Sequence, residues 1–196
     1  MNIHDFENSE VKTFSIKDFL IKYLEIPHED LESILNRVTN HNVSKDSFII
    51  MPGNISGYIY YTEKGILRMY SIDNKGKEHI VQFAPEGWLV FDRHSTYMNE
   101  PSMYYIQAVE DSVVTYLKKG YLEEIIKTYP QSTEKNLFIL NEYIMMLQYR
   151  VNLLLSTTAE ERYLDFIQAH PIFINRVPLY MIASYLGITP ESLSRV

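Results

Sequence analysis

The residues that could perform chemistry in this sequence are few and scattered. The chain has six histidines and no cysteine, which excludes disulfides, cysteine-ligated zinc or iron–sulfur sites and a thiol nucleophile. His79 and His94 could both approach one pocket, but they lack the closely spaced histidine partners that a metal-dependent jelly-roll enzyme requires. Phosphate-binding loops, nucleophile elbows and HExxH motifs are also missing. We therefore expect no enzyme activity, no metal and no cofactor.

The most informative spacing lies in LYMIASYLGITPESLSRV, residues 179–196. Two helices that cross near a right angle need a small residue where they touch, and Ala183 supplies it. The tight turn between them needs a residue that tolerates positive φ, and Gly187 supplies it four residues later. The apolar residues that would hold the pair together are Ile182, Leu186, Ile188 and Leu193. The pattern predicts a helix-turn-helix, and the alternative is a plain helical hairpin.

Capping signals divide the last 40 residues into three short helices. Thr158 and Glu161 form a capping box at the start of the first helix, which ends before Pro171. Pro178 fits the first turn of the second helix, and Thr189 can cap the third.

A long segment without glycine or proline precedes these helices, over residues 132–156. Its apolar residues recur at steps of 3, 4, 3, 4 and 3, the a/d pattern of a coiled coil. These residues are Leu137, Leu140, Ile144, Leu147, Val151 and Leu154; we call them the seam. The pattern favours pairing with a second copy, and the alternative is an amphipathic helix that packs on its own chain.

Residues 41–117 have the texture of an antiparallel barrel or jelly roll. Short β-branched and aromatic runs alternate with Gly, Pro, Asn and Asp, as in proteins with many short strands. The predicted strands are 48–51, 57–62, 66–71, 78–83, 104–109 and 112–117. A sandwich without a pocket is the alternative. Helical periodicity is present before the barrel, over residues 14–38, and again over 121–129.

The chain resembles the Crp/Fnr family of bacterial transcription regulators. TTAEERYLDFIQAHP and VPLYMIASYLGITPESLSRV are similar to that family's C-terminal domain, and GYIYYTEKGILRMYSIDNKGKEHIVQFAPEGWLV is similar to the central strands of its cyclic-nucleotide-binding barrel. The resemblance implies an α+β protein with a cyclic-nucleotide-binding-like antiparallel β-barrel, or jelly roll, over residues 1–130. A dimerisation helix over 131–156 and a winged-helix-like helix-turn-helix over 157–196 would follow.

The resemblance also implies a dimer whose second motif helix enters the DNA major groove. By position, Glu191 and Arg195 fall on the base-contacting residues of the family, while Thr189 and Ser192 fall on its phosphate contacts. Pro190 stands where the family often has a further arginine. The chain stops at Val196, about two turns into this helix. We therefore expect that either the sequence is truncated or the DNA-binding unit is unusually short.

The phosphate-binding cassette of nucleotide-binding family members is not preserved. Its Gly-Glu pair falls on Asp92-Arg93, and its Arg-Ser pair falls on Ser102-Met103. The arginine that would pair with a cyclic phosphate is therefore absent. We expect a pocket for a different small effector, or for none, with Arg93, Tyr97, Ser102 and Tyr104 as its candidate residues.

The charge and the N-terminal sequence indicate which partners and which compartment to expect. The formal net charge is −7, and the segment 150–196 is neutral, with four basic and four acidic residues. Non-specific attraction to DNA should therefore be weak. The start MNIHDFENSE lacks the features of a signal peptide, and we expect a cytoplasmic regulator with DNA, a second copy and RNA polymerase as partners and no membrane contact. The alternative is a ligand-binding or protein-interaction module that has lost DNA binding.

Overall fold

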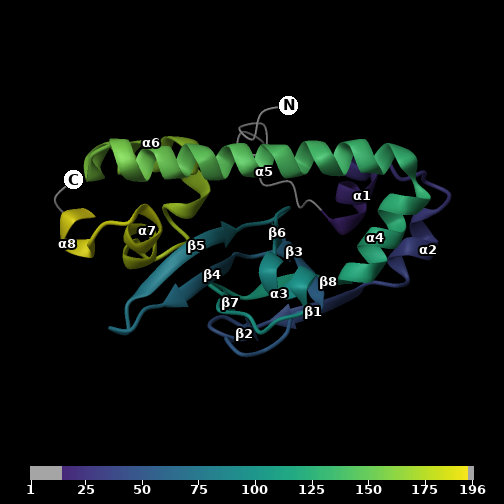
Figure 1. Ribbon diagram of the computed structural model, residues 1–196, viewed down its shortest axis with the longest axis horizontal. Helices are drawn as coiled ribbons and strands as arrows, with labels where there is room; N and C mark the ends of the chain where they lie inside the picture. Colours follow the sequence, from purple (N-terminus) through teal and green to yellow (C-terminus); the bar gives the residue numbers. More distant parts are fainter. Residues whose placement is uncertain (1–14, 194–196) are drawn as a thin grey trace.

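A single long helix organises the molecule. The computed structural model describes residues 15–193, and residues 1–14 and 194–196 lie outside the description. Helix α5 (Pro130–Ser156) runs above a β-barrel (Figure 1). At its C-terminal end lie α6 (Ala159–Ala169), α7 (Leu179–Leu186) and α8 (Pro190–Leu193), and at its N-terminal end lie α1 (Ile16–Leu24), α2 (Leu31–Leu35) and α4 (Lys119–Thr128). The predicted α+β class is confirmed.

The barrel consists of two four-stranded antiparallel sheets. One sheet has the order β1-β8-β3-β6, with β1 (Thr39–Val43), β8 (Ser112–Lys118), β3 (Tyr58–Lys64) and β6 (Leu89–Val90). The other has the order β2-β7-β4-β5, with β2 (Phe48–Ile50), β7 (Tyr105–Ala108), β4 (Leu67–Ile72) and β5 (Glu78–Ala84). The side chains between the sheets form the barrel core together with α1 and α4.

All six predicted strands are present, and the structure adds two that the sequence did not predict. Strand β1 reads TNHNV and lies at a sheet edge, where four of its five side chains are exposed. Such an edge strand needs no alternation of apolar and polar residues, so periodicity could not reveal it. Strand β6 has only two residues, which is too short for any repeat to show.

The helices begin and end within a few residues of the predicted positions, and two of the shifts involve a proline. Helix α5 begins at Pro130 rather than at residue 132, because proline fits the first turn, where its missing N–H costs nothing. Pro178 lies one position before α7 as its N-cap, where its carbonyl accepts bonds from the backbone N of Met181 and of Ile182. Thr158 and Glu161 form the predicted capping box at the start of α6.

The C-terminal helices share a core with the barrel. A second cluster of buried apolar residues joins barrel residues from β4, β5 and the neighbouring turns to α6, α7, α8 and the short 3-10 helix η2 (Pro171–Phe173). Phe83 of β5 contacts Phe173 and Tyr185, with ring centroids 5.3 Å apart in both pairs. The helix-turn-helix is thus packed on the barrel.

Candidate nucleic-acid interface and sensor cavity

The turn between α7 and α8 has the geometry that the sequence predicts for a helix-turn-helix. Gly187 adopts φ 66° and ends α7, and the backbone N of Ile188 donates to the carbonyl of Ala183 at 3.0 Å. Ala183 is fully buried where the helices meet. The four apolar residues expected to hold the pair together, Ile182, Leu186, Ile188 and Leu193, are all buried.

The start of α8 presents polar side chains to solvent. Thr189 caps the helix, since its Oγ1 accepts from the backbone N of Ser192 at 3.2 Å. Thr189 and Glu191 are exposed and Ser192 is half-buried. Arg195, the fourth predicted DNA contact, lies outside the described residues. Three of the four predicted contacts therefore fall together at one exposed helix terminus.

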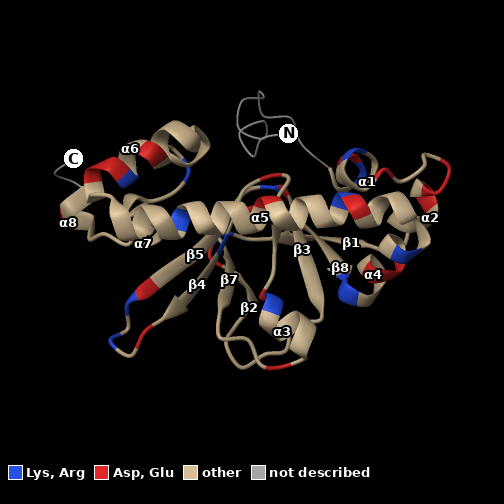
Figure 2. Ribbon diagram, turned by 45° about the horizontal axis from the view of Figure 1, so that its top comes forward, with Lys and Arg blue, Asp and Glu red and all other residues tan. Residues whose placement is uncertain are grey.

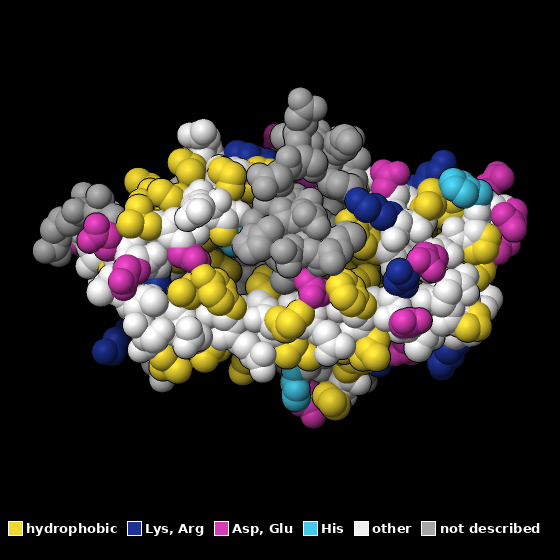
Figure 3. Space-filling view, turned by 90° about the horizontal axis from the view of Figure 1, so that it is seen from above, with side chains coloured by type: hydrophobic (Ala, Val, Ile, Leu, Met, Phe, Trp, Pro, Cys, Tyr) yellow, Lys and Arg dark blue, Asp and Glu magenta, His cyan; other side chains and the backbone are white. Residues whose placement is uncertain are grey.

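The seam of α5 is uncovered along most of its length. Leu137, Ile144, Val151 and Leu154 are exposed, whereas Leu140 and Leu147 are half-buried. Ile144, near the middle of the helix, has 43% of its surface exposed. Figure 3 looks down on the face that carries α5 and shows apolar side chains distributed over it. A monomer that leaves so many large apolar side chains in water has a surface suited to a partner.

A cavity of about 450 Å³ lies between α1, the β5–β6 region and α5. Its walls are rich in aromatic side chains and also carry charged side chains of both signs. These residues include Phe19, Trp88, Phe91, Phe138 and Tyr143, with Lys22, Arg93, Lys135, Glu134 and Glu142. The guanidinium of Arg93 lies over the rings of Phe91 and Tyr143, 4.6 and 4.8 Å from their centroids. The volume is in the range of small-molecule sites.

Only one of the four predicted pocket residues lines this cavity. Arg93 lines the cavity, but Tyr97, Ser102 and Tyr104 do not. The ring of Tyr97 is 45% exposed and lies 4.8 Å from the amine of Lys119. The Ser102 hydroxyl is bonded to Asp92 and to the backbone of Tyr104. The alternation of apolar and polar residues on short strands could not show which side chains line the same cavity.

A carboxylate of the chain itself occupies the place of the aligned phosphate cassette. Asp92 is 3% exposed and caps α3 (Arg93–Met98). Its Oδ1 accepts from the backbone N of His94 at 2.9 Å and of Ser95 at 3.2 Å, and its Oδ2 accepts from Ser102 Oγ at 2.8 Å. The donors that could hold a bound anion there are already satisfied by a fixed negative charge.

The two histidines considered as metal ligands pair with separate carboxylates. His79 Nε2 lies 2.9 Å from Asp73 Oδ2, and His94 Nε2 lies 2.9 Å from Glu100 Oε2. The hydrogen bond from His79, helped by the backbone N–H groups of Lys77 and Lys75, lowers the pKa of Asp73 to about 2. Within residues 15–193, no three histidine or acidic side chains form a group that could hold a metal ion.

Known proteins similar to this chain are regulators. The cyclic nucleotide-binding domain profile matches residues 40–129. The chain is 27% identical to an anaerobic regulatory protein of Haemophilus influenzae, over 86% of this chain and 68% of that protein. It is 28% identical to the regulatory protein HlyX of Actinobacillus pleuropneumoniae, over 93% and 80%. The solved structure of FixK2 from Bradyrhizobium japonicum matches with a TM-score of 0.68 at 22% identity, covering 81% of each chain. Over most of its length the chain is thus similar to regulators of the Crp/Fnr family.

The helix-turn-helix of this chain carries little positive charge. Helix α7 has no charged residue, and α6 carries Glu160, Glu161 and Asp165 against one arginine, as the ribbon colours of Figure 2 show. The expected weak attraction to phosphate therefore stands as a prediction about this chain.

Among the described helices, none is long and apolar enough to cross a bilayer.

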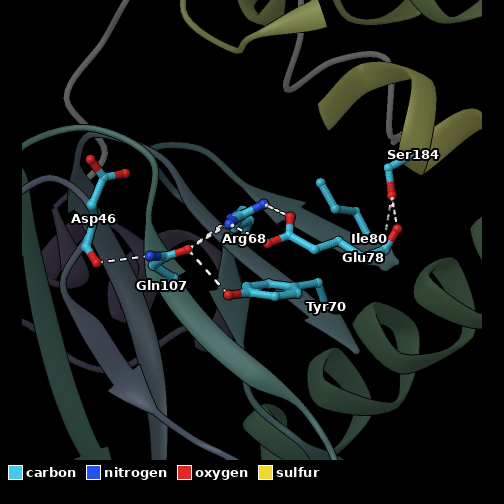
Figure 4. A network of polar contacts seen from close by, with 7 residues as sticks. All are labelled: Asp46, Arg68, Tyr70, Glu78, Ile80, Gln107 and Ser184. Carbon is cyan, nitrogen blue, oxygen red and sulfur yellow. Dashed lines mark hydrogen bonds and ion pairs between the residues drawn. The ribbon is translucent and has the colours of Figure 1, made fainter. Parts of the chain in front are cut away.

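A polar network below α7 was not foreseen from the sequence. Figure 4 shows Arg68, only 5% exposed, between Glu78 and Gln107. Its Nη1 donates to Glu78 Oε2 at 2.5 Å and its Nη2 donates to Gln107 Oε1 at 2.6 Å. The backbone of Glu78 in turn accepts from Ser184 of α7. Residues that join the barrel to the helix-turn-helix carry no local sequence signal, because their partners are distant in the chain.

Proposed function

We propose that this protein binds DNA as a homodimer, with α8 in the major groove, and regulates transcription. Two observations carry the proposal. The start of α8 is polar and exposed and is held by the Gly187 turn beside the buried Ala183, and the apolar seam of α5 is uncovered. Two motif helices related by a dimer axis read two half-sites in successive major grooves. The regulator works in the cytoplasm without catalysis of its own, with RNA polymerase as a further partner.

Three further features support dimerisation through α5. The helix has 27 residues and no glycine, and proline occurs only at its first position. The four exposed seam residues lie at coiled-coil spacing, so they form one stripe. Only Thr157 and Thr158 separate α5 from α6, so pairing of α5 would place the two helix-turn-helix units at a fixed separation.

The proposed small effector occupies the aromatic cavity beside α5, and it is not a cyclic nucleotide. Arg93, held over two aromatic rings, supplies a cation at the cavity wall. An effector bound there touches α1, β6 and α5 at once, and α5 is the helix that would carry the dimer interface. If the ligand binds one arrangement of these elements more tightly than another, it shifts the protein toward that arrangement. In this way the ligand would control DNA binding.

Selection from a random duplex library tests the proposal. The wild-type protein should enrich a palindrome with half-sites about 10 base pairs, or a multiple, apart. Arg195→Ala should lose about 1–3 kcal/mol on that site and relax the preference at one base position. Lys118→Ala, an exposed position at the end of β8, removes one positive charge from the barrel and should change binding little.

A failure to enrich any sequence has two readings that a second protein separates. The chain extended by one basic helical turn after Val196 supplies the phosphate contacts that the neutral C-terminal segment lacks. Binding by the extended chain alone means that the recognition helix is too short in this sequence. No binding by either protein contradicts the proposal and favours a module that senses a ligand or binds another protein.

A further inference from the structure

Strand β5 lies between the cavity and the helix-turn-helix. Gln82 of β5, together with Gly87 and Trp88 just after it, lines the cavity. The Nε2 of Gln82 donates to the carbonyl of Leu89 in β6 at 2.9 Å, which ties β5 to β6 on the cavity side. Strand β5 also contacts α7 directly. One short stretch of chain, residues 78–88, therefore contacts both features of the proposed function.

The C-terminal helices occupy the free edge of β5. This strand ends the sheet order β2-β7-β4-β5, so its outward N–H and C=O groups have no partner strand. Ser184 Oγ of α7 donates to the carbonyl of Glu78 at 2.7 Å and accepts from the backbone N of Ile80 at 3.1 Å. Buried backbone groups require such partners. Ser184 thus takes the place of a neighbouring strand at this position.

Arg150 of α5 completes the same edge and links it to α7. Its guanidinium donates to the carbonyls of Ile80, at 2.9 Å, and of Val81. It also donates to the carbonyl of Tyr185 at 3.0 Å and lies 4.0 Å from the centroid of that ring. Strand β5, helix α5 and helix α7 therefore meet at one side chain. A shift of any of these elements must break or move these bonds.

Arg176, in the loop before α7, binds the turn that follows β5. Its Nη1 donates to Glu86 Oε2 at 3.0 Å and its Nη2 donates to Glu86 Oε1 at 2.6 Å, and the guanidinium also bonds to Glu110. The side chain of Glu86 is only 10% exposed and that of Arg176 is 24% exposed. Paired geometry of this kind fixes orientation as well as distance. Glu86 lies two residues before Trp88 of the cavity wall.

We propose that Arg176 is a positioning residue, and that residues 78–88 couple the state of the cavity to the placement of the helix-turn-helix. The inference rests on the proposed function, in which the helix-turn-helix is the DNA reader. Coupling is reciprocal: a change in the cavity moves the reader, and release of the reader changes the cavity. Arg176 does not line the cavity, so its effect on the cavity passes through Glu86 and the turn.

Hydrogen exchange and tryptophan fluorescence test this coupling without DNA. Trp88 is the only tryptophan in the chain, so its emission reports the cavity wall alone. Arg176→Gln should speed amide exchange over residues 80–88 roughly fivefold or more and move the Trp88 emission to longer wavelength. Arg176→Lys keeps the charge and should restore both readouts in part. Arg37→Gln breaks an exposed arginine–glutamate pair elsewhere and should change neither.

The inference would be overturned if the loss of Arg176 loosened only the helix-turn-helix and left the cavity wall unchanged. In that case exchange rises only over residues 174–186 in Arg176→Gln, while residues 80–88 and the Trp88 emission match the wild type. If Arg176→Gln does not fold, Glu110→Gln removes one of the two carboxylates and is judged by the same two readouts. A protein that shows the coupling but enriches no DNA sequence, with or without the added basic helical turn, refutes the proposed function and leaves the coupling intact.

Discussion

Two glycines allow a matched test of whether the turn of the helix-turn-helix requires glycine. Gly187 has φ +66°, and an added Cβ would lie 3.1 Å from Leu154 Cδ2, whereas Gly120 in α4 has nothing within 4 Å of such an atom. Gly187→Ala should lower the free energy of unfolding by about 1–2 kcal/mol, because a Cβ is strained at positive φ. Gly120→Ala should be neutral or stabilising by up to about 1 kcal/mol. Urea denaturation measures both, and an equal effect at the two positions would contradict the account of the turn.

The buried carboxylate of Asp92 leads to a prediction about ligands. The aligned cassette has Ser102 in place of an arginine, and the Asp92 charge lies beside it. Loss of a charge-assisted contact to a buried anion costs on the order of 2–5 kcal/mol, which is a factor of roughly 30 to several thousand in affinity. Calorimetry should therefore detect no useful binding of cyclic AMP or cyclic GMP. A micromolar dissociation constant would mean that another cation, with Arg93 as the first candidate, replaces the missing arginine.

At the scale of one element, α5 carries the prediction about assembly. Ile144 is 43% exposed in the protomer, so glutamate there is compatible with the folded monomer but would bury a charge in a dimer. Ile144→Glu should give monomers in light scattering at concentrations where the wild type is dimeric. Gln148→Glu adds the same charge at an exposed position one turn further along α5 that is not part of the seam, and it should leave the dimer intact. A wild type that is monomeric at micromolar concentration would show that the seam does not pair.

Elements with local signals were predictable, and elements defined by distant partners were not. The Thr158–Glu161 capping box, the Gly187 turn and the helix around the seam were read correctly, because each depends on residues a few positions apart. Strand β1 and the role of Asp92 were missed. The first is a polar edge strand, and the second depends on Ser102, ten residues away across a turn.

The contact between the barrel and the helix-turn-helix should depend on pH. Burial of the Glu86 carboxyl raises its pKa, but the bonds from Arg176 and from backbone N–H groups outweigh this effect and hold the pKa below the usual 4.5. A carboxyl whose pKa is lowered by folding contributes stability above its ordinary pKa and loses it as the pH falls through the lowered value. The contact should therefore weaken below about pH 4.5.

Hydrogen exchange over residues 174–186, measured between pH 6 and pH 3 and corrected for the intrinsic pH dependence, follows this release. The Glu86→Gln variant cannot form the ion pair at any pH, so its corrected exchange should already be fast at pH 6 and should change less on acidification. The same acid response in wild type and variant would mean that other carboxyls control the contact.

A change in the spacing between the two half-sites shows whether one dimer reads both of them. Fluorescence anisotropy compares the selected palindrome with a duplex in which about 5 base pairs, half a helical turn, are inserted between the half-sites. The insertion leaves every base contact available but turns one half-site to the opposite face of the DNA. A dimer joined through α5 should then bind the inserted duplex no more tightly than a single half-site. Equal affinity for the two spacings would contradict the claim.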